Sequence, residues 1–159
     1  MAYTLQPLLN IRVMREDRAT GELTAARRAV RTAEEAVDSR KRELDAFEQT
    51  KEERRDRIYA AIMGRPVNRE QIDLATEGVA RIDEEGALRT DNVRRAESEL
   101  KQREAEAAAA RAAFVIASKN RIKIDEHRTE WQRKENEELE RRAEGELEDF
   151  TGRKHELDD

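Results

Sequence analysis

A chain of 159 residues that is 43% charged, 36% hydrophobic and only 4% aromatic has too few large apolar side chains for a wide globular core. Charge-rich usage of Ala, Glu, Lys, Leu and Arg with a helical period is typical of a coiled coil or another long helix. The formal net charge of −5 argues against a general nucleic-acid binder, which normally has a net basic face. Disorder is the competing interpretation at this polarity, and the periodicity described below favours helix.

Compartment and membrane signals are weak in this sequence. The chain has no cysteine, so we expect no disulfide framework and no thiolate site, which fits a reducing cytosol. No apolar run approaches the ~20 residues needed to cross a bilayer, so membrane insertion is not expected. The first residues, Met-Ala-Tyr-Thr-Leu-Gln-Pro, lack the basic and apolar regions of a signal peptide. We therefore expect a cytoplasmic protein.

The first predicted helix covers about residues 4–62, with Thr4 as its N-cap and Pro7 in its first turn. Apolar residues recur along it in a heptad ladder, which is typical of a coiled-coil seam. One set of positions is Leu9, Glu16, Leu23, Val30, Val37, Leu44, Lys51 and Ile58, and the other is Ala19, Ala26, Ala33, Arg40, Phe47, Arg54 and Ala61. The four charged residues among them make the seam imperfect.

A turn is predicted at 63–68. Gly64 tolerates the left-handed geometry of a helix end, and Pro66 disfavours the helical conformation at Arg65. Asn68 and Gln71 match a capping box that starts a second helix, about 69–150. Its heptad positions are Ile72, Val79, Gly86, Val93, Leu100, Ala107 and Phe114, with companions Ala75, Ile82, Arg89, Ala96, Arg103, Ala110, Ala117, Ile124 and Trp131. Gly78 and Gly86 weaken the helix after the turn.

These elements predict an all-α fold, a long two-helix antiparallel coiled-coil hairpin that forms one elongated domain over residues 1–159. Folding about residue 65 or 66 places residue i near 131 − i, with several residues of slack for the turn. The N-terminal end of the first helix then lies beside Ile122 to Glu126 of the second helix. Trp131 through Phe150 would form a C-terminal helical overhang without a partner in the hairpin.

No catalytic constellation is present. The two histidines, His127 and His155, lie in no ligand-spaced motif, and chance surface positions are the simpler interpretation. No Gly-rich phosphate loop exists, and a two-helix rod offers no cleft for paired carboxylates. We therefore predict no catalytic, cofactor-binding or metal site, no cofactor and no enzymatic activity.

The first twenty residues resemble the opening of the FliJ/YscO family, the small coiled-coil proteins of flagellar and virulence type III export machines. The similarity lies in Tyr3-Thr4-Leu5-Gln6-Pro7-Leu8-Leu9-Asn10-Ile11-Arg12 and in Arg15-Glu16-Asp17-Arg18-Ala19. The length, the hairpin pattern and a longer, acidic-ended second helix agree over the whole chain. The Glu/Arg-rich tail is more similar to the virulence branch than to the flagellar one.

The resemblance implies a monomeric central stalk on the cytoplasmic side of an inner-membrane export apparatus. Its partners would be the hexameric export ATPase, which it stimulates, the cytoplasmic ring of the export gate, and export chaperones. The implied ATPase-facing residues are Leu5, Leu8, Leu9, Arg12, Arg15, Arg18, Trp131, Leu139, Leu147 and Phe150. The implied gate-facing residues are Phe47, Tyr59, Ile72, Val79 and Ile82.

Two other functions fit the same pattern. A self-associating coiled-coil scaffold would bury its seam between chains, and sedimentation would find a dimer or larger species. A chaperone-binding escort protein would use the exposed overhang, and truncation after Trp131 would then abolish chaperone binding without loss of ATPase stimulation.

Overall fold

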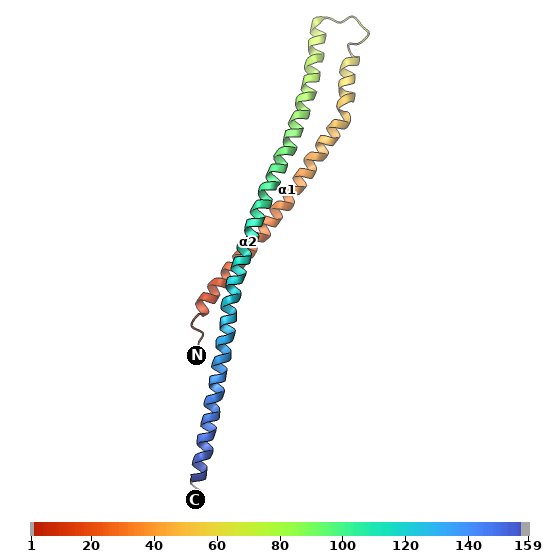
Figure 1. Ribbon diagram of the computed structural model, residues 1–159. Helices are drawn as coiled ribbons and strands as arrows, with labels where there is room; N and C mark the ends of the chain where they lie inside the picture. Colours follow the sequence, from red (N-terminus) through yellow and green to blue (C-terminus); the bar gives the residue numbers. More distant parts are fainter. Residues whose placement is uncertain (1, 157–159) are drawn as a thin grey trace. The chain divides into compact units, whose positions relative to one another are not determined.

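The computed structural model describes the backbone of residues 2–156 and the side chains of residues 2–149. In this part the chain forms two long helices, α1 (Gln6–Ala60) and α2 (Arg69–Glu156), packed against each other, and no strand (Figure 1). The all-α two-helix hairpin predicted from the heptad pattern is confirmed. The acidic end at 157–159 lies outside the described residues.

Contacts between residues divide the chain into two units, which are described separately. Unit 1 is Met1–Glu22 with Arg111–Asp159, and unit 2 is Leu23–Ala110. Each unit contains part of α1 packed against part of α2. In unit 2, Arg54 pairs with Glu85 and Lys41 pairs with Glu97, so the helices run in opposite directions there. In unit 1, Glu16 pairs with Arg121, and Tyr3 packs on Trp131.

The start of α1 differs slightly from the prediction. The Leu9 N–H donates to the Leu5 carbonyl, which closes the first helical turn, and α1 begins at Gln6. Thr4 therefore lies in a turn ahead of the helix, and the N-cap predicted there is one residue early. Pro7 lies in the first turn as expected, where the missing N–H has no partner to lose.

Apart from Tyr3, the described residues that are buried all lie at predicted heptad positions, and most other ladder positions are half-buried. Burial of the apolar stripe of each helix is the main source of stability for such a fold. The buried ladder residues are Leu9, Ala19, Leu23, Ala33, Val37 and Phe47 in α1, and Ala75, Ile82, Gly86 and Val93 in α2. Ile72 is the exception on α2, since it is exposed.

Three charged residues on the α1 ladder form ion pairs. Glu16 forms an ion pair with Arg121 across unit 1, and Arg54 pairs with Glu85 across unit 2 at 2.8 Å. Arg40 instead pairs within its own helix, with Glu43 at 3.0 Å. The imperfect positions therefore join the helices electrostatically in two of these three places.

The segment between the helices confirms the predicted turn chemistry. Gly64 has φ of 72°, in the left-handed region that favours glycine. The Gln71 N–H donates to Asn68 Oδ1 at 2.9 Å, and the Asn68 N–H donates to Gln71 Oε1 at 3.0 Å. These reciprocal bonds are the capping box, and they satisfy two donors at the start of α2.

The pairing of the helices is displaced from the simple fold-back expectation. Lys41 pairs with Glu97 where residue 90 was expected, and Ile58 packs on Gly78 where residue 73 was expected. The cause is the asymmetry of segment 61–68. In Figure 1 the first turns of α2 extend past the end of α1, and the connecting segment continues beyond α1 and crosses to the start of α2.

Candidate interaction surfaces

Tyr3, which precedes α1, fixes the N-terminal segment onto α2 in unit 1. Its hydroxyl lies 2.7 Å from His127 Nδ1, and its ring centroid lies 5.4 Å from that of Trp131. Tyr3 is buried, and Trp131 is half-buried. One expectation is therefore wrong, because Trp131 has a partner within the hairpin. His127 is exposed, as expected for a surface histidine, and it also contacts Tyr3.

The residues predicted to face the ATPase differ in exposure. Leu9 is buried between the helices and serves the hairpin itself. Leu8 and Arg12 are half-buried, while Leu5 is exposed. Arg15 and Arg18 are also exposed, and the latter pairs with Glu22 at 3.0 Å. Beyond Trp131, Leu139 and Leu147 are exposed, and the side chain of Phe150 lies outside the described residues.

Unit 1 also has an exposed apolar surface that the heptad ladders did not predict. Its large exposed side chains, apart from the N-terminal and tail leucines, are Ile11, Val13, Met14, Val115, Ile116 and Ile122. A shallow groove on this surface is lined by Arg12, Arg15, Ala113, Ile116, Ala117 and Asn120. A single ladder per helix cannot reveal these residues, because they lie outside the hairpin seam.

A sequence signal for this surface does exist in the charge pattern. Segments 2–15 and 107–124 contain six basic residues and no acidic one, in a chain with 37 acidic residues. We call these two segments the acid-free surface. The basic residues are Arg12, Arg15, Arg111, Lys119, Arg121 and Lys123. Arg121 pairs with Glu16 at the edge of this surface. Exposed apolar groups interspersed with an excess of cations are typical of a docking surface for an acidic partner.

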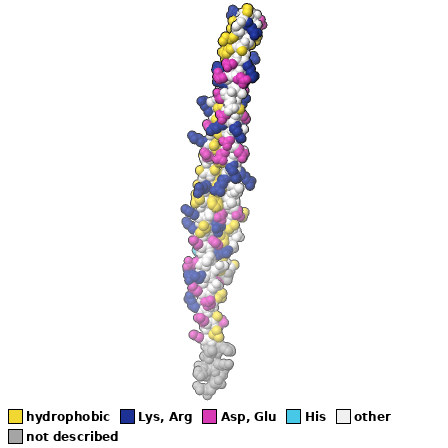
Figure 2. All heavy atoms as spheres, turned by 90° about the vertical axis from the view of Figure 1, so that its right-hand side faces the viewer, with side chains coloured by type: hydrophobic (Ala, Val, Ile, Leu, Met, Phe, Trp, Pro, Cys, Tyr) yellow, Lys and Arg dark blue, Asp and Glu magenta, His cyan; other side chains and the backbone are white. Residues whose placement is uncertain are grey.

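The residues predicted to face the export gate are divided between the interior and the surface of unit 2. Phe47 and Ile82 are each only 3% exposed, so they pack the helices together and are not available to a partner. Val79 is half-buried, whereas Tyr59 and Ile72 are exposed. Met63 and Leu74, which the prediction omitted, are more exposed still. Figure 2 shows apolar side chains gathered at the end that carries the connecting segment.

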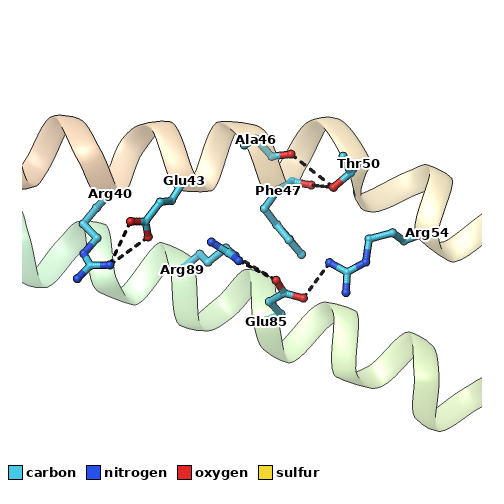
Figure 3. A network of polar contacts seen from close by, with 8 residues as sticks. All are labelled: Arg40, Glu43, Ala46, Phe47, Thr50, Arg54, Glu85 and Arg89. Atoms are coloured by element: carbon cyan, nitrogen blue, oxygen red, sulfur yellow. Dashed lines mark hydrogen bonds and ion pairs between the residues drawn. The ribbon is translucent and has the colours of Figure 1, made fainter.

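Phe47 is surrounded by a charged cluster, which Figure 3 shows. The guanidinium carbons of Arg54 and Arg89 lie 5.6 and 5.5 Å from its ring centroid, within the range of cation–π contacts. The Glu85 carboxylate lies between the same two arginines, 2.9 Å from Arg89 and 2.8 Å from Arg54. Hydrogen bonds from Arg89 and Arg54 lower the pKa of Glu85 below its ordinary value.

The ring of Phe47 reaches α2 at Gly86. A Cβ built on Gly86 would lie 2.9 Å from Phe47 Cε1, and one on Gly78 would lie 3.1 Å from Ile58 Cδ1. The two glycines therefore provide space for α1 side chains against the backbone of α2. The sequence predicts only that these glycines weaken the helix, because it does not show which residue faces a glycine.

The described part of the chain was predicted to hold no metal site and no membrane-spanning helix, and two findings bear on this. No group of three or more His, Cys, Asp or Glu side chains among the described residues could hold a metal ion. None of the helices there combines the length and the apolar character that crossing a membrane requires. What this part of the chain offers is interaction surface.

Comparisons with known proteins agree with the N-terminal resemblance. A family model described as type III secretion protein YscO matches residues 5–153. No curated protein sequence matches the chain significantly. Among solved structures, a protein described as a YscO homologue, CT670 of Chlamydia trachomatis, has a TM-score of 0.74 at 20% identity. The match covers 99% of this chain and 96% of that one, and at this identity it shows the shared fold. The chain belongs to the YscO family of type III secretion proteins.

Proposed function

We propose that this chain is the central stalk of a type III export ATPase, with unit 1 bound inside the hexameric ring and the turn end of unit 2 directed to the export gate. Membership of the YscO family supports a role in type III secretion. The observation that carries the finer assignment is the acid-free surface, which combines exposed Ile, Met and Val side chains with arginine and lysine.

The mechanism requires no chemistry by the stalk itself. A single two-helix hairpin inside a sixfold ring presents a different face to each subunit. Contacts that differ between subunits favour different nucleotide states around the ring, and this bias is what couples the stalk to turnover. Binding that was equal for all states would leave turnover unchanged.

Exposed residues of the acid-free surface are the best probes of the contact with the ring. Met14 and Ile116 are 69% and 62% exposed, so their replacement leaves the hairpin packing in place. By contrast, replacing Trp131 would also release Tyr3, because the two rings are in contact. Leu88 is a matched control, since it is exposed to a similar degree on α2 but belongs to unit 2.

The test is ATP hydrolysis by the cognate export ATPase, titrated with the native chain, with Met14→Glu/Ile116→Glu, and with Leu88→Glu. We expect stimulation by the native chain and by the control, saturating near one chain per hexamer. The double variant should need roughly tenfold more protein for the same stimulation, as loss of an interface anchor predicts. If the native chain neither stimulated hydrolysis nor promoted hexamer formation, the stalk function would be wrong and the scaffold function would replace it.

A further inference from the structure

Three arginines within five residues of α1, in unit 2, have no partner in the described part of the chain. The side chains of Arg27, Arg28 and Arg31 are exposed, and none of their guanidinium groups forms an ion pair or a hydrogen bond with a described residue. By contrast, every arginine of the same helix between positions 40 and 57 pairs with a carboxylate or donates to a backbone carbonyl.

The sequence explains why this cluster is unpaired. Residues 23–33 contain the three arginines and no acidic residue. Arg27 and Arg31 are four residues apart, and Arg28 and Arg31 are three apart, so their charges repel each other along the helix. Carboxylates bound from outside the chain would relieve this repulsion.

A groove of about 580 Å³ lies beside the cluster, between the two helices of unit 2. Arg27 and Arg31 line it together with Val30 of α1 and Ala107 of α2. Val30 and Ala107 are half-buried, and they provide apolar surface next to the two guanidinium groups. Cations beside a small apolar floor suit an acidic ligand that also carries an apolar group.

The groove also has an acidic end. Glu34 and Glu104 line it, and neither forms an ion pair with an arginine of the cluster. The pairing of Lys41 with Glu97 sets a register in which Glu34 and Glu104 are level with each other, one turn beyond the cluster. The carboxylates of an occupant therefore belong at the other end, beside the arginines.

We propose that this groove, which we call the arginine groove, binds an acidic helix of a partner protein. Two carboxylates four residues apart on that helix pair with Arg27 and Arg31, and a leucine-sized side chain between them covers Val30 and Ala107. Arginine is suited to this task because its planar guanidinium binds a carboxylate through two parallel hydrogen bonds. A helix presents side chains at i, i+3 and i+4 on one face, so all three groups enter the groove together.

The arginine groove is a third surface, beside the two that the proposed function uses. Its arginines belong to unit 2, whereas the basic residues of the acid-free surface belong to unit 1. Arg31 lies 29 residues before the end of α1 at Ala60, about 44 Å at the helical rise, so the groove is also remote from the turn. A chain that failed to stimulate the ATPase would still bind an acidic helix here.

The experiment is fluorescence anisotropy of a labelled, alanine-rich helical peptide titrated with the full chain. One peptide carries two glutamates four residues apart with a leucine three residues after the first, and a companion peptide carries lysines in place of the glutamates. The native chain should bind the glutamate peptide at least tenfold more tightly than the lysine peptide. Arg27→Glu/Arg31→Glu should reverse this preference, since the charges of the groove are then exchanged.

Arg65→Glu/Arg94→Glu is the matched control. It makes the same change in net charge at two exposed arginines of unit 2 that have no ion pair among the described residues and lie outside the groove. This variant should keep the native preference, and circular dichroism establishes that each variant remains helical.

Four results would overturn the proposal. They are a native chain without the preference, a groove variant that still prefers glutamate, a control variant whose preference is reversed as well, and undiminished binding of a glutamate peptide with alanine in place of its leucine. Displacement of the glutamate peptide by single-stranded DNA at lower concentration than by unlabelled peptide would assign the groove to nucleic acid instead.

Discussion

The contact between Phe47 and Gly86 shows how single residues set the distance between the helices in unit 2. Glycine within a helix costs about 1 kcal/mol relative to alanine. At Gly86 the missing Cβ leaves room for the ring of Phe47, which is among the least exposed side chains described. The local cost is offset because a large aromatic group is buried against the backbone.

Gly86→Ala should therefore destabilise the protein, although alanine is the better helix former. The new Cβ would lie 2.9 Å from the Phe47 ring, and overpacking costs typically 1–3 kcal/mol, against a gain of about 1 kcal/mol in helix propensity. Gly21→Ala is the matched control, since nothing lies within 4 Å of its built Cβ, and it should stabilise by up to about 1 kcal/mol. Urea denaturation followed by circular dichroism measures both. Equal stabilisation by the two changes would contradict the packing role of Gly86.

Glu85 should make stability depend on pH in the acidic range. Its pKa in the folded chain lies below the ordinary value of 4.5, because Arg89 and Arg54 donate hydrogen bonds to the carboxylate. Because the pKa of Glu85 is lowered, its ionised carboxylate adds to the free energy of unfolding above pH 4.5. This stabilisation is lost as the pH falls through the folded-state pKa. The difference in unfolding free energy between the native chain and Glu85→Gln should therefore narrow below that pH.

Urea denaturation at several pH values between neutrality and the acidic range measures this difference. Glu84→Gln is the control, since Glu84 is the exposed neighbour of Glu85 on the same helix. If the native and Glu85→Gln curves remained parallel through the acidic range, the arginine pair would not be holding the carboxylate ionised.

At the scale of elements, the start of α2 depends on two side chains rather than on tertiary packing. Asn68 and Gln71 exchange hydrogen bonds with each other's backbone N–H groups, and both side chains are exposed. The first turns of α2 extend beyond the end of α1, so few contacts with α1 support them (Figure 1). The cap therefore determines where the helix begins.

Asn68→Ala should cost about 1 kcal/mol, as removal of a helix cap usually does. Ser39→Ala, an exposed change inside α1, should be neutral or slightly stabilising by comparison. Hydrogen exchange of the amides at 69–73 is the more local measurement, and these amides should lose protection while those of α1 keep theirs. Unchanged protection at 69–73 would mean that packing and not the cap holds this turn.

At the scale of the whole molecule, the heptad pattern predicted the fold because burial between two helices leaves a strict period in the sequence. The ladder from Leu9 to Ile58 and the turn chemistry at Asn68 were predictable for this reason. The contact of Tyr3 with Trp131 was not, since Tyr3 precedes the helix and has no place in its period.

The displaced pairing has a similar cause. A fold-back about residue 65 or 66 treats the turn as symmetric, but α2 begins beyond the end of α1 (Figure 1). The residues predicted to face the export gate show that a heptad period alone does not tell which apolar residues remain exposed. Phe47 and Ile82 were chosen as large apolar residues of the hairpin, and large apolar residues on the seam are the ones that the partner helix covers.

The stalk function assigns different partners to unit 1 and to the turn end of unit 2, so variants of the two should have separable effects. Ile72→Ser/Leu74→Ser replaces exposed side chains near the turn. We expect this variant to stimulate the ATPase as the native chain does and to lower secretion of a reporter about tenfold, as loss of an interface anchor predicts. Met14→Glu/Ile116→Glu should lower both activities, because a stalk that does not engage the ring cannot transmit its turnover. Leu88→Ser, a similarly exposed change on α2, should retain both ATPase stimulation and secretion.

ATP hydrolysis in vitro and reporter secretion in cells, measured for the same variants, test whether the two ends have separate partners. If both double variants lowered hydrolysis and secretion equally, the two ends would not have separate partners.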